Sequence, residues 1–271
     1  MLEPCAQHAL ACARLPHGEG RRIRHGMNPI VVIPARMAAT RLPGKPLADI
    51  AGRPMILRVL DAARAGGIGP VLVAAGDREI VDIVRADGGR AELTDPGLAS
   101  GSDRVLAALR AADPDRAHDV VVNLQGDLPD LPARALAELM AALAADGDAD
   151  IATLAVADDG DESRSNPNIV KAVLAERDSL PARALYFTRA PAPWGPGPVW
   201  KHVGIYAYRR SALERFCALP PSKLEQREKL EQLRALEAGM RIVVAPLDDA
   251  PDGVDTPEDL ERARARFSAQ K

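Results

Sequence analysis

Short apolar runs alternate with segments of helical spacing between residues 30 and 157, and this alternation limits the folds that the chain can adopt. The runs at 30–33, 71–75 and 120–122 carry no charge and are typical of buried strands. Helices that connect consecutive strands imply right-handed βαβ crossovers and a parallel sheet. We therefore predict an α/β fold with a Rossmann-like, mostly parallel sheet flanked by helices.

The pattern changes at about residue 158, where polar, turn-rich sequence begins. A proline- and glycine-rich loop at 190–200 and an aromatic strand at 201–210 follow. We interpret residues 158–210 as a smaller substrate lobe. We also predict a helix over 102–112 with Ser102 as its N-cap, an amphipathic helix over 222–239, a strand at 241–247 and a last helix capped by Thr256.

The first 26 residues differ from the rest, with scattered small side chains, a basic end and no signal-peptide core. We expect a disordered extension or a mis-assigned start rather than a targeting segment. The 271 residues then allow one folded α/β domain, over 27–271, with the smaller lobe inserted in it.

Composition excludes several classes of protein. The net charge of −3 gives no reason to expect nucleic acid or an anionic membrane as a partner. No apolar stretch approaches the roughly 18 to 20 residues that a membrane-spanning helix needs, so we expect no membrane insertion. Cys5, Cys12 and Cys217 form no CxxC pair, which argues against a disulfide framework or zinc site and indicates the cytoplasm.

The segment PARMAATRLPGK, residues 34–45, is a basic loop that directly follows the first predicted strand. Ligands of open α/β sheets bind at the carboxyl ends of the strands. Arg36, Arg41 and Lys45, with the backbone N–H groups of a glycine turn, would suit phosphates there. Neither GxxxxGK[ST] nor GxGxxG is present. Spacing alone leaves a solvated loop with incidental cations as an equal alternative.

Two aspartates are candidate ligands of Mg²⁺. Asp127 comes soon after the strand at 120–122, so its carboxylate should lie at that strand's carboxyl end. Mg²⁺ is commonly bound by one or two carboxylates together with phosphate oxygens. Asp255 would be the second ligand, although it also suits the start of the last helix. A turn aspartate is the alternative for Asp127 if no second carboxylate lies nearby.

Seven segments together resemble one enzyme family from Met27 onward. The segments, in chain order, are PARMAATRLPGKPLADIAGRPMI, SGSDRV, NLQGDLP, ALYFTRAPAPW, KHVGIYAYRR, LEQLRAL and GVDTPEDLE. They closely resemble the 3-deoxy-manno-octulosonate cytidylyltransferases, also called CMP-Kdo synthetases. The first segment is shared by sugar nucleotidyltransferases in general, whereas YFTRA…PW, KHVGIYAYR and LEQLR are typical of the Kdo enzymes.

The resemblance implies a fold of the nucleotide-diphospho-sugar transferase type, CTP and Kdo as substrates, Mg²⁺ as cofactor and a homodimer. It implies that Arg36 and Lys45 hold the triphosphate, with Arg41 weaker, and that Asp127 and Asp255 carry the metal and act in catalysis with them. Arg104 would lie by the nucleotide. The residues implied for the sugar pocket are Gln125, Arg189, His202, Tyr206, Glu231 and Gln232.

Taken singly, several of these residues have ordinary structural explanations. Tyr206 or Tyr208 could be core, and His202 could be structural. Glu231 and Gln232 could lie on the solvated face of a helix, and the arginine after ALYF could end a buried run. Only their joint order in the family pattern raises them above these alternatives.

The chain also departs from the family pattern. Leu128 stands after Asp127 where a glutamate is common, the segment 194–201 is short, and AGD at 75–77 replaces a Thr-Asp-rich turn. These departures bear on a carboxylate near the metal, on dimer geometry and on contacts to the base. Two rivals stay open: a cytidylyltransferase for another acid sugar such as sialic acid, which the same basic loop would serve, and a non-catalytic nucleotide-binding relative, which Leu128 would signal.

Overall fold

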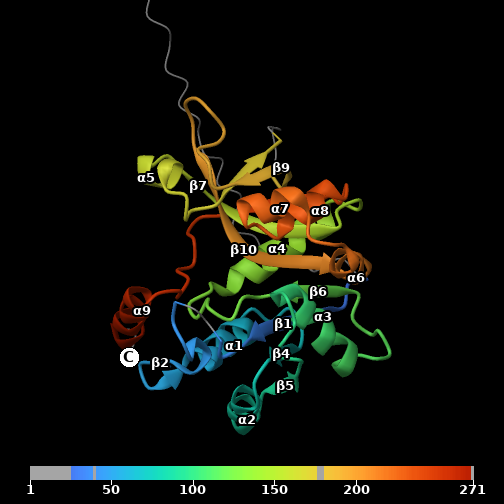
Figure 1. The fold of residues 1–271 in the computed structure, drawn as a ribbon, viewed down its shortest axis with the longest axis vertical. Coiled ribbons are helices and arrows are strands. Elements are labelled where there is room, and N and C mark those ends of the chain that lie inside the picture. The colour runs from blue at the N-terminus through green and yellow to red at the C-terminus, as the bar shows by residue number, and fades with distance from the viewer. Residues whose placement is uncertain (1–25, 39–40, 176–179, 270–271) are drawn as a thin grey trace, which may run out of the picture.

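A computed structural model describes residues 26–38, 41–175 and 180–269 (Figure 1). The predicted N-terminal extension lies outside the described residues except for Gly26. None of the helices in the described ranges is long and apolar enough to cross a membrane.

The described chain is built around a nine-stranded sheet. A two-stranded ribbon of β2 (Asp49–Ile50) and β3 (Arg53–Pro54) follows the basic loop. The strands of the main sheet, in spatial order, are β5 (Arg90–Leu93), β4 (Val71–Ala75), β1 (Pro29–Ala35), β6 (Val120–Asn123), β10 (Val199–Arg209), β7 (Ile151–Asp158), β11 (Ile242–Leu247), β9 (Ala182–Thr188) and β8 (Lys171–Leu174).

The prediction of a mostly parallel sheet was wrong, because the sheet is mixed. β5, β4, β1 and β6 are mutually parallel, and β7 is parallel to β11. β10 runs antiparallel to β6, β7 and β8, and β9 runs antiparallel to β8 and β11. Sequence periodicity reports burial and not strand direction, so the regular βαβ pattern of the first half was extended too far.

Helices cover both faces of the sheet, as the alternating side chains of β1 require. Val31 and Ile33 pack into one apolar cluster, whereas Ile30 and Val32 pack into the other. The first cluster contains side chains of α1 (Met55–Ala65), α2 (Arg78–Ala86), α4 (Ala133–Ala145) and α9 (Pro257–Ala269). The second contains side chains of α3 (Gly101–Ala112), α6 (Arg210–Ala218) and α8 (Gln232–Glu237), and α7 (Lys223–Glu228) packs its partly buried Leu224 against it.

Two local predictions about helices were wrong and one was confirmed. The helix expected over 222–239 is two helices, α7 and α8, because Lys229 takes a left-handed conformation with φ of 59°. The N-cap of α3 is Ser100, whose hydroxyl accepts from the Asp103 N–H at 3.1 Å, and not Ser102. Thr256 does cap α9, accepting from the Asp259 N–H at 3.2 Å.

The strand order reverses between β1 and β6. From β1 the chain proceeds outward to β4 and β5, and then returns to place β6 on the other side of β1. Such a reversal leaves a crevice at the carboxyl ends of the two strands. The segment 158–210 supplies α5 (Asp161–Ser165), β8, β9 and β10 to the same molecule, and its assignment as a separate lobe stays a prediction.

Candidate active site

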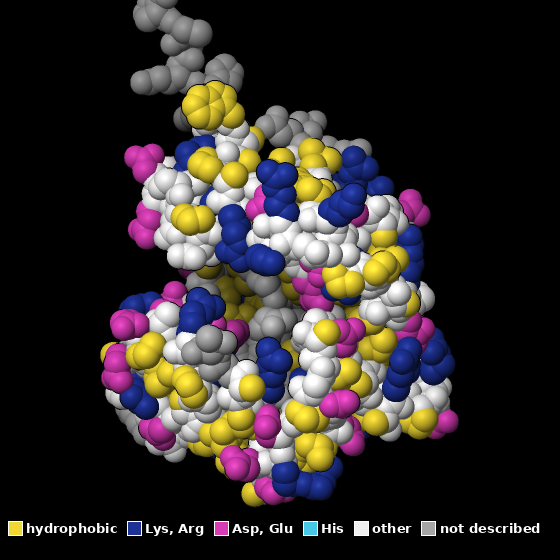
Figure 2. Space-filling view, in the orientation of Figure 1, with side chains coloured by type: hydrophobic (Ala, Val, Ile, Leu, Met, Phe, Trp, Pro, Cys, Tyr) yellow, Lys and Arg dark blue, Asp and Glu magenta, His cyan; other side chains and the backbone are white. Residues whose placement is uncertain are grey.

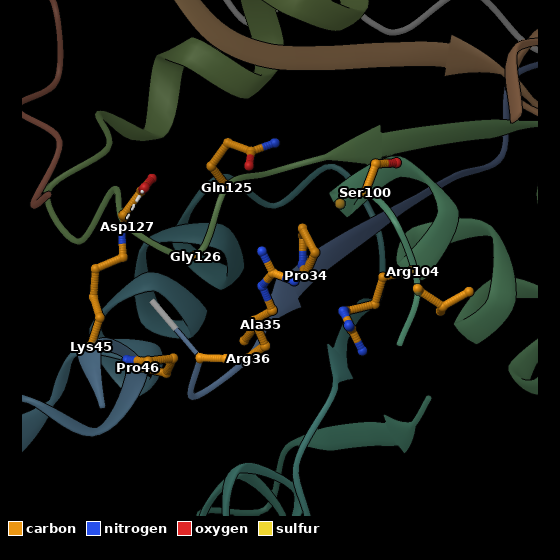
Figure 3. A pocket seen from close by; sticks show the side chains of 13 residues that line it. Pro34, Ala35, Arg36, Lys45, Pro46, Ser100, Arg104, Gln125, Gly126 and Asp127 are labelled. Atoms are coloured by element: carbon orange, nitrogen blue, oxygen red, sulfur yellow. Dashed lines mark hydrogen bonds and ion pairs between the residues drawn. The ribbon is translucent and has the colours of Figure 1, made fainter. Parts of the chain in front are cut away.

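A cleft of about 330 Å³ opens at the reversal between β1 and β6. Figure 2 shows the molecule hollowed between its lower part, which carries β1, β4 and β5, and its upper part, which carries β7 and β9 (Figure 1). In Figure 3, Lys45 and Asp127 lie at one end of this pocket and Arg104 and Ser100 at the other. The polar residues that line it include Arg36, Lys45, Ser100, Arg104, Gln125 and Asp127.

Lys45 joins the two predicted metal ligands. Its Nζ lies 2.8 Å from Asp127 Oδ2 and 3.0 Å from Asp255 Oδ1. Arg41 reaches Asp255 Oδ2 at 2.9 Å from the solvent side. The Val254 N–H donates to the Asp127 carbonyl at 2.9 Å, and this backbone bond brings the segment before α9 to the end of β6. The two carboxylates therefore share one site.

The charge of Lys45 is held firmly in this site. Burial disfavours its ammonium form, but the attraction of Asp127 and Asp255 outweighs that penalty and raises the pKa of Lys45 above its usual value. Lys45 is therefore a permanent cation facing two carboxylates. An anion entering the cleft would compete with those carboxylates for the ammonium, whereas a divalent cation would compete with the ammonium for them.

Arg36 and Arg104 supply positive charge at the other side of the cleft (Figure 3). Arg36 is exposed, while Arg104 is buried and donates to Thr94 Oγ1 at 2.5 Å and to the Asp95 carbonyl at 3.2 Å. Burial and the nearby Arg36 lower the pKa of Arg104. A like-charged pair with few acceptors in a cleft favours a ligand that carries several negative charges.

Gln125 and Glu231 belong to one chain of side-chain contacts. Gln125 Nε2 donates to Asn123 Oδ1 at 3.1 Å, and Asn123 Nδ2 lies 3.5 Å from Ser102 Oγ. Ser102 Oγ donates to Glu231 Oε2 at 2.9 Å. Two predicted sugar residues from distant parts of the sequence are thus brought close together by α3 and β6.

His202 and Tyr206 lie on β10 beside this chain. Tyr206 is opposite Asn123 in the β10–β6 register, and its ring centroid lies 5.6 Å from that of His202. The His202 Nε2 is 3.0 Å from Thr153 Oγ1. Burial lowers the pKa of His202 to about 3, so its imidazole is neutral near pH 7. Burial, with the negative charge of Glu231, raises the pKa of Tyr206 well above its usual value.

The structure does not bring Arg189 and Gln232 to the cleft by any contact of their side chains. Arg189 follows β9 and donates through Nε to the Glu228 carbonyl at 2.9 Å and through Nη1 to the Pro167 carbonyl at 3.0 Å. Gln232 is 5% exposed at the start of α8. Their roles in sugar binding therefore stay predictions.

The three departures from the family pattern have local explanations or remain predictions. Leu128 is 7% exposed and packs in the core, so its side chain takes no part in the lining of the cleft. In the AGD turn, a Cβ on Gly76 would lie 2.8 Å from Arg104 Nη1. Asp77 Oδ2 accepts from the Met37 N–H at 2.7 Å and so anchors the basic loop. The effect of 194–201 on dimer geometry stays a prediction.

Sequence reasoning missed four residues of the site. Ser100 and Gly126 line the cleft, and a Cβ on Gly126 would lie 2.8 Å from the Pro34 carbonyl, which explains the glycine in QGD. Ser102 and Asn123 were present in the quoted segments SGSDRV and NLQGDLP. Both could have been noticed because they are polar where apolar residues were expected, Ser102 on the buried face of a helix and Asn123 at the end of a buried strand.

The paired carboxylates suit a divalent metal that takes its remaining ligands from a phosphate substrate. Asp127 and Asp255 already face one cation, the Lys45 ammonium. Among the described residues, no group of three or more His, Cys, Asp and Glu side chains is arranged to enclose a metal. Two carboxylates with an open side are the donor set that Mg²⁺ uses when phosphates complete its shell.

Known proteins are similar to this chain in sequence and in fold. The sequence profile of the cytidylyltransferases matches residues 30–242. This chain belongs to the cytidylyltransferase family. A protein of Parvibaculum lavamentivorans named 3-deoxy-manno-octulosonate cytidylyltransferase is 60% identical over 241 residues, which are 89% of this chain and 93% of the relative. A protein of the same name from Rhodospirillum centenum is 61% identical over 242 residues, which are 88% and 93% of the two chains.

Solved structures agree with the family assignment. A structure described as CMP:2-keto-3-deoxy-manno-octonic acid synthetase complexed with CTP is 38% identical, with a TM-score of 0.82 over 90% of this chain and 100% of the other. A nucleotidyl transferase from Methanothermobacter is 17% identical, with a TM-score of 0.57 over 91% of this chain and 100% of the other, and shares the fold alone. The resemblance drawn from the seven sequence segments is confirmed.

Proposed function

We propose that this cytidylyltransferase transfers CMP from CTP to 3-deoxy-D-manno-octulosonate (Kdo), giving CMP-Kdo and pyrophosphate. The observation that carries the proposal is the cleft at the β1–β6 reversal, where cations and two carboxylates meet. The names of the relatives at 60% and 61% identity support Kdo as the sugar, and the solved neighbour with CTP supports the nucleotide.

In this proposal the basic side of the cleft binds the triphosphate. Arg36 and Lys45 bind phosphate oxygens and stabilise the leaving pyrophosphate, and Arg41 is a weaker third cation at the solvent edge. Arg104 lies by the nucleotide. Most of the rate enhancement comes from positioning and from neutralising charge, because phosphoryl-type transfer needs little covalent chemistry from the protein.

Asp127 and Asp255 would hold Mg²⁺ in this proposal. The metal, when bound, would polarise the α-phosphate and help to orient the attacking hydroxyl. Lys45 would then direct its ammonium to the phosphates instead of to both carboxylates. Lys45 would then be paired with phosphate, and Asp127 and Asp255 with the metal. For this reason the three side chains fit a nucleotide that carries Mg²⁺.

The sugar would enter from the side of β10. Gln125, His202, Tyr206, Glu231 and Gln232 would bind it, and Arg189 would pair with its carboxylate. The anomeric hydroxyl would attack the α-phosphorus in line with the leaving pyrophosphate. The neutral His202 would act as a hydrogen-bonding group and not as a charged one, because its lowered pKa keeps it uncharged.

Pyrophosphate release with Mg²⁺, CTP and either Kdo or sialic acid tests the proposal. We expect release with Kdo alone, and omission of Mg²⁺ should abolish it. Release with sialic acid instead would keep the family and reject the sugar. Tight CTP binding with no release for either sugar would support the non-catalytic alternative.

Replacement of Asp127 is the sharpest test of the paired carboxylates. We expect Asp127→Asn to reduce kcat by at least about 100-fold, because a neutral amide is a poor ligand for Mg²⁺. Folding, followed by circular dichroism, should be intact. The control is Asp248→Asn, which removes an exposed carboxylate paired with Arg134 and should leave kcat unchanged. A fully active Asp127→Asn enzyme would reject this metal site.

The biological setting follows from the same proposal. CMP-Kdo synthesis would place the enzyme in lipopolysaccharide biosynthesis in the cytoplasm. A homodimer is also proposed from the family resemblance, and analytical ultracentrifugation of the full chain would test it.

A further inference from the structure

Two buried polar residues lie between the residues that we propose for the sugar. Ser102 is 1% exposed and Asn123 is 2% exposed. Neither is needed for the secondary structure that contains it, because Ser100 caps α3 and the β6 ladder uses only the backbone of Asn123. Buried polar side chains cost stability unless they are hydrogen-bonded, so the purpose of this pair lies in the contacts of their side chains.

Those contacts fix the orientation of Gln125 and Glu231. Asn123 Oδ1 accepts from Gln125 Nε2 at 3.1 Å, so the amide nitrogen of Gln125 is used in a hydrogen bond within the protein. Ser102 Oγ donates to Glu231 Oε2 at 2.9 Å. The Asn123 amide lies 3.5 Å from the Ser102 hydroxyl and closes the chain. Each outer residue thus has one of its two polar atoms bound by the protein.

The atoms that remain are both hydrogen-bond acceptors. Glu231 Oε1 is buried and has no hydrogen-bond partner among the described residues, and its nearest cation, Arg234 Nη2, is 3.8 Å away. Gln125 Oε1 is the other acceptor, because its amide nitrogen is bound to Asn123. A ligand that fits two fixed acceptors must present donors, and hydroxyl groups are the donors of a sugar.

We propose that Ser102 and Asn123 are positioning residues that hold Glu231 and Gln125 in place to accept hydrogen bonds from hydroxyl groups of the acid sugar. This inference rests on the proposed function, since it takes the sugar side of the cleft from there. Ser102 is two residues before Arg104 on α3, so the same helix orders the nucleotide side and the sugar side. Ser102 and Asn123 make no hydrogen bond to Arg36, Lys45 or Arg104, which we propose for the nucleotide, so their effect falls on the sugar.

The first test compares Ser102→Ala with the wild-type full-length enzyme, with Mg²⁺ present. We expect KM for Kdo to rise about tenfold, since Glu231 loses a charge-assisted hydrogen bond, and KM for CTP to change less than about twofold. Ser102→Thr retains the hydroxyl and should restore much of the affinity. Equal increases for both substrates would mean that α3 has only shifted, and would overturn the proposal.

Ser163→Ala is the matched control. Ser163 is also buried, at 6% exposure, and donates to a carboxylate, Asp158 Oδ2, at 2.7 Å, but it lies on α5 away from the cleft. We expect this variant to lower the melting temperature without raising KM for Kdo. If it raised KM for Kdo as much as Ser102→Ala does, loss of stability would explain both effects and the positioning role would be rejected.

A double-mutant cycle with Glu231→Ala decides whether Ser102 acts through Glu231. If it does, adding Ser102→Ala to Glu231→Ala should change KM for Kdo by less than about twofold. Full additivity of the two effects would refute the coupling. Failure of the proposed function is distinguishable, because the wild-type enzyme would then release no pyrophosphate with Kdo before any variant is compared.

Discussion

At the scale of single residues, the two tyrosines Tyr206 and Tyr208 of β10 have different neighbours. Tyr208 is 2% exposed and packs with Phe216, at 5.9 Å between ring centroids, whereas Tyr206 faces Asn123 and His202. Sequence alone could not decide which tyrosine is core, because residues two apart on a strand point to the same face of the sheet. Helix α6, which brings Phe216, makes the decision.

His202 gives a residue-scale prediction about acid stability. Its pKa is lowered to about 3 by burial, so between that value and about 6.5 the unfolded chain binds a proton that the native chain excludes. Stability from this group is therefore complete above about pH 6.5 and is lost as the pH falls. As the pH falls from about 7 to about 5, we expect the free energy of unfolding to decrease by about 1–2 kcal/mol less in His202→Gln than in the wild type.

Urea unfolding of both proteins at the two pH values measures this difference. The wild type and the variant share every other titrating group, so the difference between their pH dependences isolates His202. Parallel losses of stability in the two proteins would show that the native imidazole protonates as readily as the unfolded one.

At the scale of elements, helices and buried strands could be predicted, whereas strand direction and helix breaks could not. The strands β1, β4 and β6 and the helices α1, α2 and α4 follow from apolar periodicity and glycine stops. The break at Lys229 has no such signal, because lysine rarely takes a positive φ. β9 was not assigned, because its residues include the exposed Leu185 and do not alternate simply.

The site was predictable to the extent that it follows strand ends. Arg36, Gln125 and Asp127 come soon after β1 or β6, so parallel strands bring them together. Asp255 was a candidate second carboxylate from the sequence, but the start of the last helix explained it as well, because no local signal encodes the backbone bond between Val254 and Asp127 that places it. Arg104 required the family pattern, since it comes from a helix.

The turn after β4 gives an element-scale prediction. A Cβ on Gly76 would lie 2.8 Å from Arg104 Nη1 and 3.2 Å from Arg36 Cβ. Because the end of a guanidinium can move, we expect Gly76→Ala to displace Arg104, raising KM for CTP about tenfold, with little loss of stability. Steady-state kinetics and thermal unfolding check both parts.

Gly147→Ala is the control, since a Cβ there meets nothing within 4 Å. An unchanged KM for CTP in Gly76→Ala would mean that Arg104 finds an equivalent place or does not bind the nucleotide. A large loss of stability would instead show that the backbone of the turn cannot accept a side chain.

At the scale of the whole molecule, charge is distributed unevenly. The chain has a net charge of −3, yet Arg36, Arg41, Lys45 and Arg104 gather around one cleft. In Figure 2, Lys and Arg side chains lie on the rim of the hollow, and Asp and Glu side chains are spread over the visible face. A local positive field of this kind favours a small polyanion.

Ionic strength should therefore act differently on the two substrates. Raising KCl from about 0.05 M to about 0.5 M shortens the screening length from above 10 Å to below 8 Å, and we expect KM for CTP to rise several-fold. KM for Kdo, which carries one carboxylate, should rise less. Initial rates with each substrate varied in turn measure both values, and equal responses would argue against a focused field at the cleft.

The return of the Asp255 segment to the cleft also has a consequence for biosynthesis. Lys45 and Asp255 are 210 positions apart in the chain. A ribosome that adds about 5–20 residues per second needs roughly 10–40 s to make the intervening polypeptide. Until that interval ends the chain has the basic loop but not Asp255, so a nascent chain cannot form the carboxylate pair. Catalytic competence would arrive late in translation, all at once.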